Sequence, residues 1–216
     1  IRRNILHYLT GQAAIAVFGL LGNAVLARFM SKSDFGKLTY FIALATLLLP
    51  ALDPGATGLY LRRASRHRDR VGVYWARTIG LKVYSIPFTI ALLVCYFYFV
   101  TGYIDISMPL VFLYGLGQSM MLSTDVAFRA TERGRSWAIR RAVYEASYLV
   151  LTLISLAVFH LTNPIQQLVL AVIALGIGMA WAVTTAVRIS QISLKDFVGQ
   201  ILRRLTWEEI GDLWPF

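Results

Sequence analysis

Two aspartates, Asp53 and Asp125, lie inside long apolar segments of the sequence and are the first candidates for chemistry. A charged side chain at the centre of a bilayer costs about 2.5 to 3.5 kcal/mol on insertion scales, so such residues usually face the interior of a helix bundle or a water-filled cavity. We therefore predict that both aspartates serve in coupling or gating. A structural alternative is that Asp53 only bonds backbone amides freed by a kink.

The sequence around Asp53 also predicts a hinge. The apolar segment 38–52 runs into Asp53-Pro54-Gly55. A proline inside a helix lacks the N–H donor and clashes with the preceding turn, at a cost of roughly 3 kcal/mol or more, and a glycine loosens the next turn. We expect the helix to break here, with Pro50, Pro54 and Gly55 as the bending point.

Five further polar residues are candidates for a substrate-binding cavity: Asn23, Arg28, Lys82, Gln118 and Arg129. Arg28 stands at the end of its segment and Lys82 one turn inside its own, so both have the alternative of extending to the membrane interface. Gly19 and Gly22, close to Asn23, are expected to allow close helix packing.

Helical spacing places Gln118, Asp125 and Arg129 on one face, because they are seven and four residues apart. The Asp125–Arg129 spacing also suits a simple neutralised pair. Arg141 and Glu145 are also four residues apart and also suit a simple neutralised pair.

The composition is that of a membrane protein. Of the 216 residues, 57% are hydrophobic and only 15% are charged, whereas soluble domains carry about 25% charged residues. The net charge of +10 would suit nucleic acid only on a soluble fold with a basic face, so no nucleic-acid partner is expected. Cys95 is the single cysteine, which excludes an intrachain disulfide and a cysteine metal site.

Six segments are long enough to cross a bilayer, which takes about 20 residues. We predict an all-α, polytopic fold with spans at 6–29, 38–61, 78–100, 108–128, 142–160 and 165–187. Placing both ends in the cytoplasm puts 17 of the 21 Lys and Arg residues on that side, as the positive-inside rule requires. The lobe of spans would occupy residues 1–190.

Residues 191–216 are expected to form a cytoplasmic amphipathic linker. Apolar residues from Leu194 to Leu205 recur at helical spacing, and Ser193 with Asp196 has the pattern of a capping box. Thr206 with Glu209 repeats this pattern, which predicts a second helix near Trp207. Because the sequence stops in an apolar stretch, we expect a missing second lobe to follow; the alternative is a surface anchor.

Enzyme activity is not expected. Membrane transferases that use metals need several converging acids, and the three histidines have no ligand spacing or adjacent nucleophile motif. The sequence also lacks a G-x-x-x-x-G-K-[ST] phosphate loop. No cofactor is predicted, although H⁺ or Na⁺ could couple transport.

Several short motifs resemble those of bacterial polysaccharide transporters, the O-antigen and exopolysaccharide flippases of the multidrug/oligosaccharidyl-lipid/polysaccharide superfamily. Residues 26–38, LARFMSKSDFGKL, resemble their first loop, A-R-x-L-x-P-x-D-F-G-x-Y. Asp53-Pro54-Gly55 before Leu61-Arg62-Arg63 is similar to their D-x-G and basic loop, and residues 130–133, ATER, to their fourth connection. Ser33 replaces the usual proline, and Pro54 intrudes in D-x-G.

The resemblance implies one N-terminal six-helix lobe of a two-lobe transporter in the bacterial inner membrane. It implies alternating-access export of an undecaprenyl-diphosphate-linked glycan for lipopolysaccharide, O-antigen or exopolysaccharide synthesis. The expected partners are that lipid-linked glycan, the lipid bilayer and a second lobe of the same polypeptide. A drug or metabolite exporter of the same architecture, with a smaller and more apolar cavity, and a non-transporting scaffold subunit remain alternatives.

Overall fold

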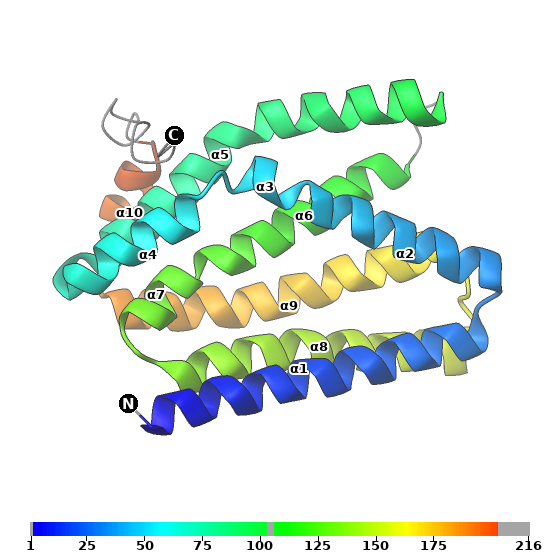
Figure 1. Ribbon diagram of the computed structural model, residues 1–216, viewed down its shortest axis with the longest axis horizontal. Coiled ribbons are helices and arrows are strands. Elements are labelled where there is room, and N and C mark those ends of the chain that lie inside the picture. The colour runs from blue at the N-terminus through cyan, green and yellow to red at the C-terminus, as the bar shows by residue number, and fades with distance from the viewer. Residues whose placement is uncertain (1, 103–105, 203–216) are drawn as a thin grey trace.

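A computed structural model describes residues 2–102 and 106–202, and these residues form an elongated bundle of helices without a strand (Figure 1). The α-helices before residue 100 are α1 (Arg2–Phe29), α2 (Lys32–Leu47), α3 (Leu49–Leu52), α4 (Ala56–Arg66) and α5 (Val71–Tyr96). The later ones are α6 (Ser107–Ser123), α7 (Asp125–Ala130), α8 (Gly134–Val158), α9 (Pro164–Ser190) and α10 (Leu194–Leu202). A 3₁₀ turn, η1 (Arg68–Arg70), precedes α5, and a π-helical turn, η2 (Phe97–Thr101), follows it. The predicted all-α class is confirmed.

Five helical stretches in the described residues are long and apolar enough to cross a membrane. They are Leu9–Phe29, Lys32–Leu52, Arg68–Val100, Gly134–Val158 and Pro164–Ser190. The fourth predicted span corresponds to α6, which has only 17 residues, and α7, which follows after Thr124. The chain is therefore a polytopic membrane protein, and its count of six spans remains a prediction.

The long helices run roughly along one axis, and α1 lies alongside α8 (Figure 1). Helix α9 packs against both α8 and α6, while α5 lies along the outer edge against α4, α6 and α10. One apolar core, including Leu26, Leu44 and Leu175, joins α1, α2, α6, α8 and α9. A second, around Trp75 and Phe128, joins α4, α5, α7 and α9.

The predicted hinge is a real break in the helix. Helix α3 ends at Leu52, α4 starts at Ala56, and Asp53 has φ −136° and ψ 75°. Gly55 has φ 84°, a left-handed conformation that glycine adopts without the penalty of a Cβ atom. Pro54 lies within the break, and Pro50 lies in the first turn of α3, where a proline is tolerated.

A second break was not predicted. Helix α6 ends at Ser123 and α7 starts at Asp125, with Thr124 at φ −67° and ψ −14° between them. The backbone thus stays right-handed at this position. No proline or glycine marks this position.

Helix α10 begins with the predicted capping box, since Ser193 Oγ accepts from the Asp196 amide at 3.1 Å and donates to its carboxylate at 2.6 Å. Its apolar face contacts α5, where Phe197 lies 4.8 Å from Trp75 between ring centroids. The described part of the predicted amphipathic linker therefore packs on α5, and its cytoplasmic location stays a prediction. The second linker helix, near Trp207, falls outside the described residues.

Candidate functional site

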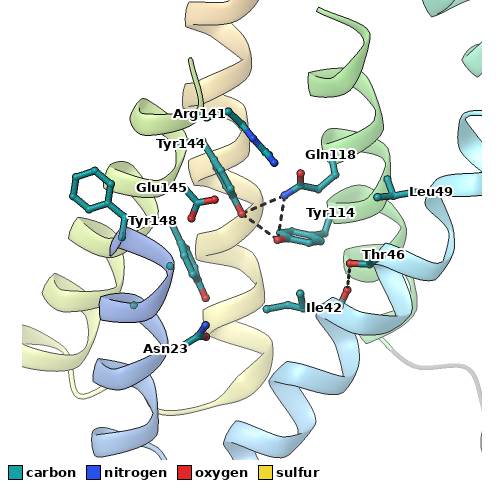
Figure 2. Close-up of a pocket in the computed structure, with 13 residues that line it drawn as sticks. Asn23, Ile42, Thr46, Leu49, Tyr114, Gln118, Arg141, Tyr144, Glu145 and Tyr148 are labelled. Atoms are coloured by element: carbon teal, nitrogen blue, oxygen red, sulfur yellow. Dashed lines mark hydrogen bonds between the residues drawn. The ribbon is translucent and has the colours of Figure 1, made fainter. Parts of the chain in front are cut away.

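A polar cavity of about 360 Å³ lies between α1, α2, α6 and α8 (Figure 2). Its lining consists of Phe18, Gly19, Gly22 and Asn23 of α1, Ile42 and Thr46 of α2, Leu49 of α3, Tyr114 and Gln118 of α6, and Arg141, Tyr144, Glu145 and Tyr148 of α8. This volume lies in the range of ligand pockets, about 300 to 1,000 Å³. The space between these helices is partly open, and hydroxyl, amide and ionic groups make up much of its lining.

One wall of the cavity is a hydrogen-bonded group of two tyrosines and a glutamine. The Tyr114 and Tyr144 hydroxyls are 3.0 Å apart, and Gln118 Nε2 donates to both, at 3.2 and 3.3 Å (Figure 2). Both tyrosines are buried. Because their hydroxyls are bonded to each other and to one amide, the rings are held in a fixed orientation.

The side of the cavity that carries Tyr144 comes from one face of α8. Arg141, Tyr144, Glu145 and Tyr148 follow the spacing i, i+3, i+4 and i+7, which brings side chains to the same side of a helix. Arg141 is one turn from Glu145, so a cation and an anion enter the cavity next to each other.

The glycines of α1 make room in the cavity wall. A Cβ atom built on Gly19 or Gly22 would meet no other atom within 4 Å. The expectation that these glycines allow close helix packing is therefore wrong. They leave open space beside Asn23, which larger side chains would fill.

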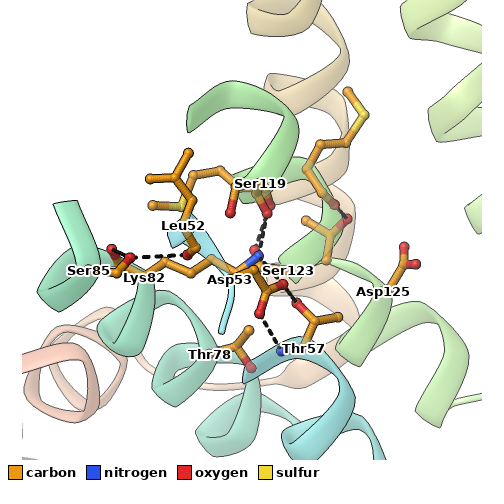
Figure 3. A network of polar contacts seen from close by, with 12 residues as sticks. Leu52, Asp53, Thr57, Thr78, Lys82, Ser85, Ser119, Ser123 and Asp125 are labelled. Atoms are coloured by element: carbon orange, nitrogen blue, oxygen red, sulfur yellow. Dashed lines mark hydrogen bonds and ion pairs between the residues drawn. The ribbon is translucent and has the colours of Figure 1, made fainter. Parts of the chain in front are cut away.

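Asp53 takes part in an ion pair whose lysine is fully buried (Figure 3). Its Oδ2 lies 3.0 Å from Lys82 Nζ of α5, and the Lys82 side chain is completely buried. Thr57 donates its amide to Asp53 Oδ1 at 3.0 Å and its hydroxyl to Oδ2 at 2.5 Å. Lys82 also donates to the Ser119 carbonyl of α6 at 2.5 Å. One ion pair thus connects the hinge with α4, α5 and α6.

The break at Asp53 leaves backbone groups without helical partners, and nearby side chains satisfy two of them. The Thr57 amide in the first turn of α4 bonds the Asp53 carboxylate, and the Leu52 carbonyl accepts from Ser85 Oγ at 3.1 Å. In a bilayer such bonds are needed, because no water is available to replace them. The contacts predicted under the structural alternative for Asp53 are present.

Asp125 forms a second buried ion pair, with a partner that the sequence did not predict. Arg140 Nη1 of α8 lies 2.6 Å from Asp125 Oδ1, and the same nitrogen donates to the Met121 carbonyl at 2.7 Å and to Thr124 Oγ1 at 2.5 Å. Trp137 Nε1 donates to Asp125 Oδ1 at 3.1 Å. The predicted pair with Arg129 is present, at the longer distance of 3.8 Å.

The predicted site residues thus fall into separate groups. Asn23 and Gln118 line the cavity, Asp53 pairs with Lys82, and Asp125 pairs with Arg129 and Arg140. Arg28 is exposed and lines a shallow depression at the end of α1 with Leu21, Ala24, Val25 and Phe29. Among the described residues, Lys82, Arg28 and Arg129 are not part of the cavity lining.

The sequence analysis missed the tyrosines of the cavity, Tyr114, Tyr144 and Tyr148, and interpreted Arg141 and Glu145 only as a neutralised pair. The polar stripe of α8 at i, i+3, i+4 and i+7 was an available signal. In the described segments, no group of three or more His, Cys, Asp or Glu side chains is arranged to hold a metal ion.

Fold and site together define an α-helical, polytopic membrane protein with broken helices and a polar cavity inside the bundle. A family model described as "Polysaccharide biosynthesis protein" matches residues 1–206, and the chain belongs to this family. No curated protein matches the chain, and neither does any solved structure. The resemblance found in the sequence motifs is therefore confirmed at the level of the family.

Proposed function

We propose that this chain is the N-terminal half of a flippase that exports a lipid-linked oligosaccharide or polysaccharide precursor by alternating access. The observation that carries the proposal is the polar cavity of about 360 Å³ inside an apolar bundle. Family membership supports the link to polysaccharide synthesis. The chain would act in the bacterial inner membrane, with both ends of residues 1–216 in the cytoplasm.

The cavity chemistry suits a saccharide joined to a phosphate. Sugars offer many hydroxyl groups, which the hydroxyls of Tyr114, Tyr144 and Tyr148 and the amides of Asn23 and Gln118 can bond. Their apolar faces suit contact with aromatic rings. Arg141 supplies the fork of donors that binds phosphate oxygens well. We add it to the proposed cations Arg28, Lys82 and Arg129, of which Lys82 and Arg129 are occupied by aspartates.

Asp53 is proposed as the gating or coupling acid, with H⁺ or Na⁺ as the coupling ion, and Asp125 is retained as a second candidate. Neutralising Asp53 would leave the buried Lys82 ammonium without its counter-charge. Such a loss would favour a conformation in which Lys82 is solvated. A change in the free-energy difference between two conformations shifts their populations. The break at Pro54 and Gly55 gives the chain a place to bend.

Broken helices near the membrane midplane are a recurrent feature of transporters built from repeats, in which the substrate lies between two lobes. Rocking against a second lobe of the same polypeptide would expose the cavity to each side in turn. The product would serve lipopolysaccharide, O-antigen or exopolysaccharide synthesis.

The lining also bears on the alternatives. A drug or metabolite exporter of this architecture is expected to have a more apolar cavity with fewer ions, and the ionic and hydroxyl groups here favour a saccharide. A non-transporting scaffold would have polar groups that only satisfy one another. The two ion pairs fit that alternative, but the open space beside Gly19 and Gly22 does not.

Filling the cavity tests the proposal. Leucines at Gly19 and Gly22 would project into open space, and leucine has a higher helix propensity than glycine. G19L/G22L should therefore accumulate normally but abolish glycan export in cells that lack the native gene. The control is G176L on α9, where a Cβ also meets no atom within 4 Å. Normal export by the double variant would overturn the proposal.

A further inference from the structure

Arginines crowd the end of α4 and the turn that follows it. Five arginines, Arg62, Arg63, Arg66, Arg68 and Arg70, occur within nine residues, and 56–66 contains no acid. Arg63 is half-buried over the Tyr60 ring, 5.8 Å from its centroid. The other four are exposed, and we call them the α4 arginine cluster.

Helix α4 carries two members of this cluster, Arg62 and Arg66, away from its packed face, and the other two lie in η1. Ala56, Tyr60 and Ala64, spaced four residues apart, are buried in the bundle. Arg62 and Arg66, also four apart, are exposed. Like charges at this spacing repel each other and destabilise a helix. The described part of the chain provides no ion pair to either of them.

Intramolecular contacts neutralise the cluster only in part. Arg68 bonds Glu132, which ties η1 to the connection between α7 and α8, and Arg70 lies 3.6 Å from Asp69. The helix dipole favours cations in the last turn of α4, which explains Arg63 and Arg66 but not Arg62. A surplus of positive charge therefore remains on this surface.

The position of the cluster indicates what neutralises it. Helix α4 continues the second membrane segment beyond Asp53, and it reaches the end of the bundle where α1 begins and α10 lies (Figure 1). Four to eight basic residues directly beyond a membrane helix are typical of binding sites for anionic lipids. Arginine in particular binds phosphate through two parallel hydrogen bonds.

We propose that the α4 arginine cluster binds the phosphate headgroups of anionic membrane lipids. The first turn of α4 is bonded to the Asp53 carboxylate through Thr57, so a lipid bound at the other end of α4 holds this helix between the membrane surface and the hinge. Lipid composition then influences the orientation of α4. This site is separate from the cavity and does not depend on what the cavity transports.

The test measures lipid binding to the native-length polypeptide in detergent by native mass spectrometry, with phosphatidylglycerol and phosphatidylcholine as probes. R62Q/R66Q removes two charges from the cluster, and R188Q/K195Q removes two exposed charges elsewhere. At about 1 kcal/mol per basic residue, the first pair should weaken phosphatidylglycerol binding roughly tenfold or more, and the second by less than about twofold.

R62K/R66K keeps the charges and should keep the preference for phosphatidylglycerol. Soluble glycerol phosphate at the same concentration should not displace the lipid, which would distinguish a membrane lipid from a free phosphate ligand. Equal losses in R62Q/R66Q and R188Q/K195Q would overturn the proposal, because they would indicate a general charge effect. Equal binding of the two lipids by the wild type would also overturn it. So would displacement of bound phosphatidylglycerol by an acidic peptide but not by competing lipid.

Discussion

Asp53 and Asp125 each lie at a break between two consecutive helices, yet their surroundings differ. Asp53 pairs with a lysine at a break that contains a proline and a left-handed glycine. Asp125 pairs with an arginine at a break where the backbone stays right-handed. Lysine is a point charge that can lose its proton in a buried site, whereas arginine stays charged and bonds in a fixed, planar geometry. The first break is suited to movement and the second to rigidity.

The hydrogen bonds of Arg140 and Lys82, the partners of the two aspartates, also indicate a rigid second break and a movable first break. Arg140 bonds a carboxylate, a backbone carbonyl and a hydroxyl, and its side chain is only 1% exposed. Lys82 bonds one carboxylate and one carbonyl. We infer that the Asp125–Arg140 pair stabilises the fold and that the Asp53–Lys82 pair is the one able to open.

Replacing Arg140 should have the largest effect on stability. Arg140→Leu leaves the buried Asp125 carboxylate with only the longer, 3.8 Å contact to the exposed Arg129, and removing one partner of a buried pair costs about 3 to 5 kcal/mol. Thermal unfolding in detergent would measure this loss. The neighbouring Arg141→Leu is the control and should change stability by less than about 1 kcal/mol. Equal losses in the two variants would remove the distinction between the breaks.

Asp53→Asn should cost less, about 1 to 3 kcal/mol. An asparagine oxygen can still accept from the Thr57 amide, and Lys82 can lose its proton. Export should be lost although the protein is present in normal amounts. Normal export at normal abundance would exclude Asp53 as the gating acid.

The Asp53–Lys82 coupling is measured by adding Lys82→Met. The double variant D53N/K82M should be more stable than the sum of the single losses implies, with a coupling energy of about 0.5 to 3 kcal/mol. Unfolding of all four proteins in one detergent gives this value. Additive losses would mean that the two side chains, 3.0 Å apart, do not stabilise each other.

The smallest expected difference in stability is between alanine variants of two serines near the first break, Ser85 and Ser119. Ser85→Ala removes the donor to the Leu52 carbonyl and should cost about 1 kcal/mol. Ser119 contributes its backbone carbonyl to Lys82, and its own buried hydroxyl has no hydrogen-bond partner in the described residues. Ser119→Ala should therefore cost no stability, because it removes a buried hydroxyl that makes no hydrogen bond. The reverse order would contradict the assigned bonds.

The sequence predicted the features that depend on local chain chemistry. Asp53-Pro54-Gly55 contains the residues that break a helix, and Ser193 with Asp196 contains those that begin one. The break at Thr124 has no such signal, because it accompanies the tertiary contacts of Arg140. Asp125 and Arg140 likewise lie fifteen residues apart on different helices, so helical spacing could not predict their contact.

The cavity was predicted only in part for the same reason. Asn23 and Gln118 are conspicuous because polar amides are unusual among apolar residues. In the sequence, Tyr114 and Tyr144 look like ordinary core residues. Only the tertiary arrangement of α6 and α8 brings their hydroxyl oxygens within 3.0 Å of each other. Gly19 and Gly22 have the spacing of packing glycines, and their open surroundings depend on the distance to α2 and α6.

Protection of a cysteine at position 23 tests most directly that the cavity binds the substrate. Asn23→Cys would be placed in a Cys95→Ser background, because the native cysteine is exposed, and labelled with a water-soluble maleimide. Arg188→Cys, exposed at the end of α9, is the control. We predict that purified lipid-linked saccharide slows labelling at position 23 and leaves position 188 unchanged. A cysteine at position 23 that does not react, or that reacts equally fast with and without the saccharide, would contradict the account.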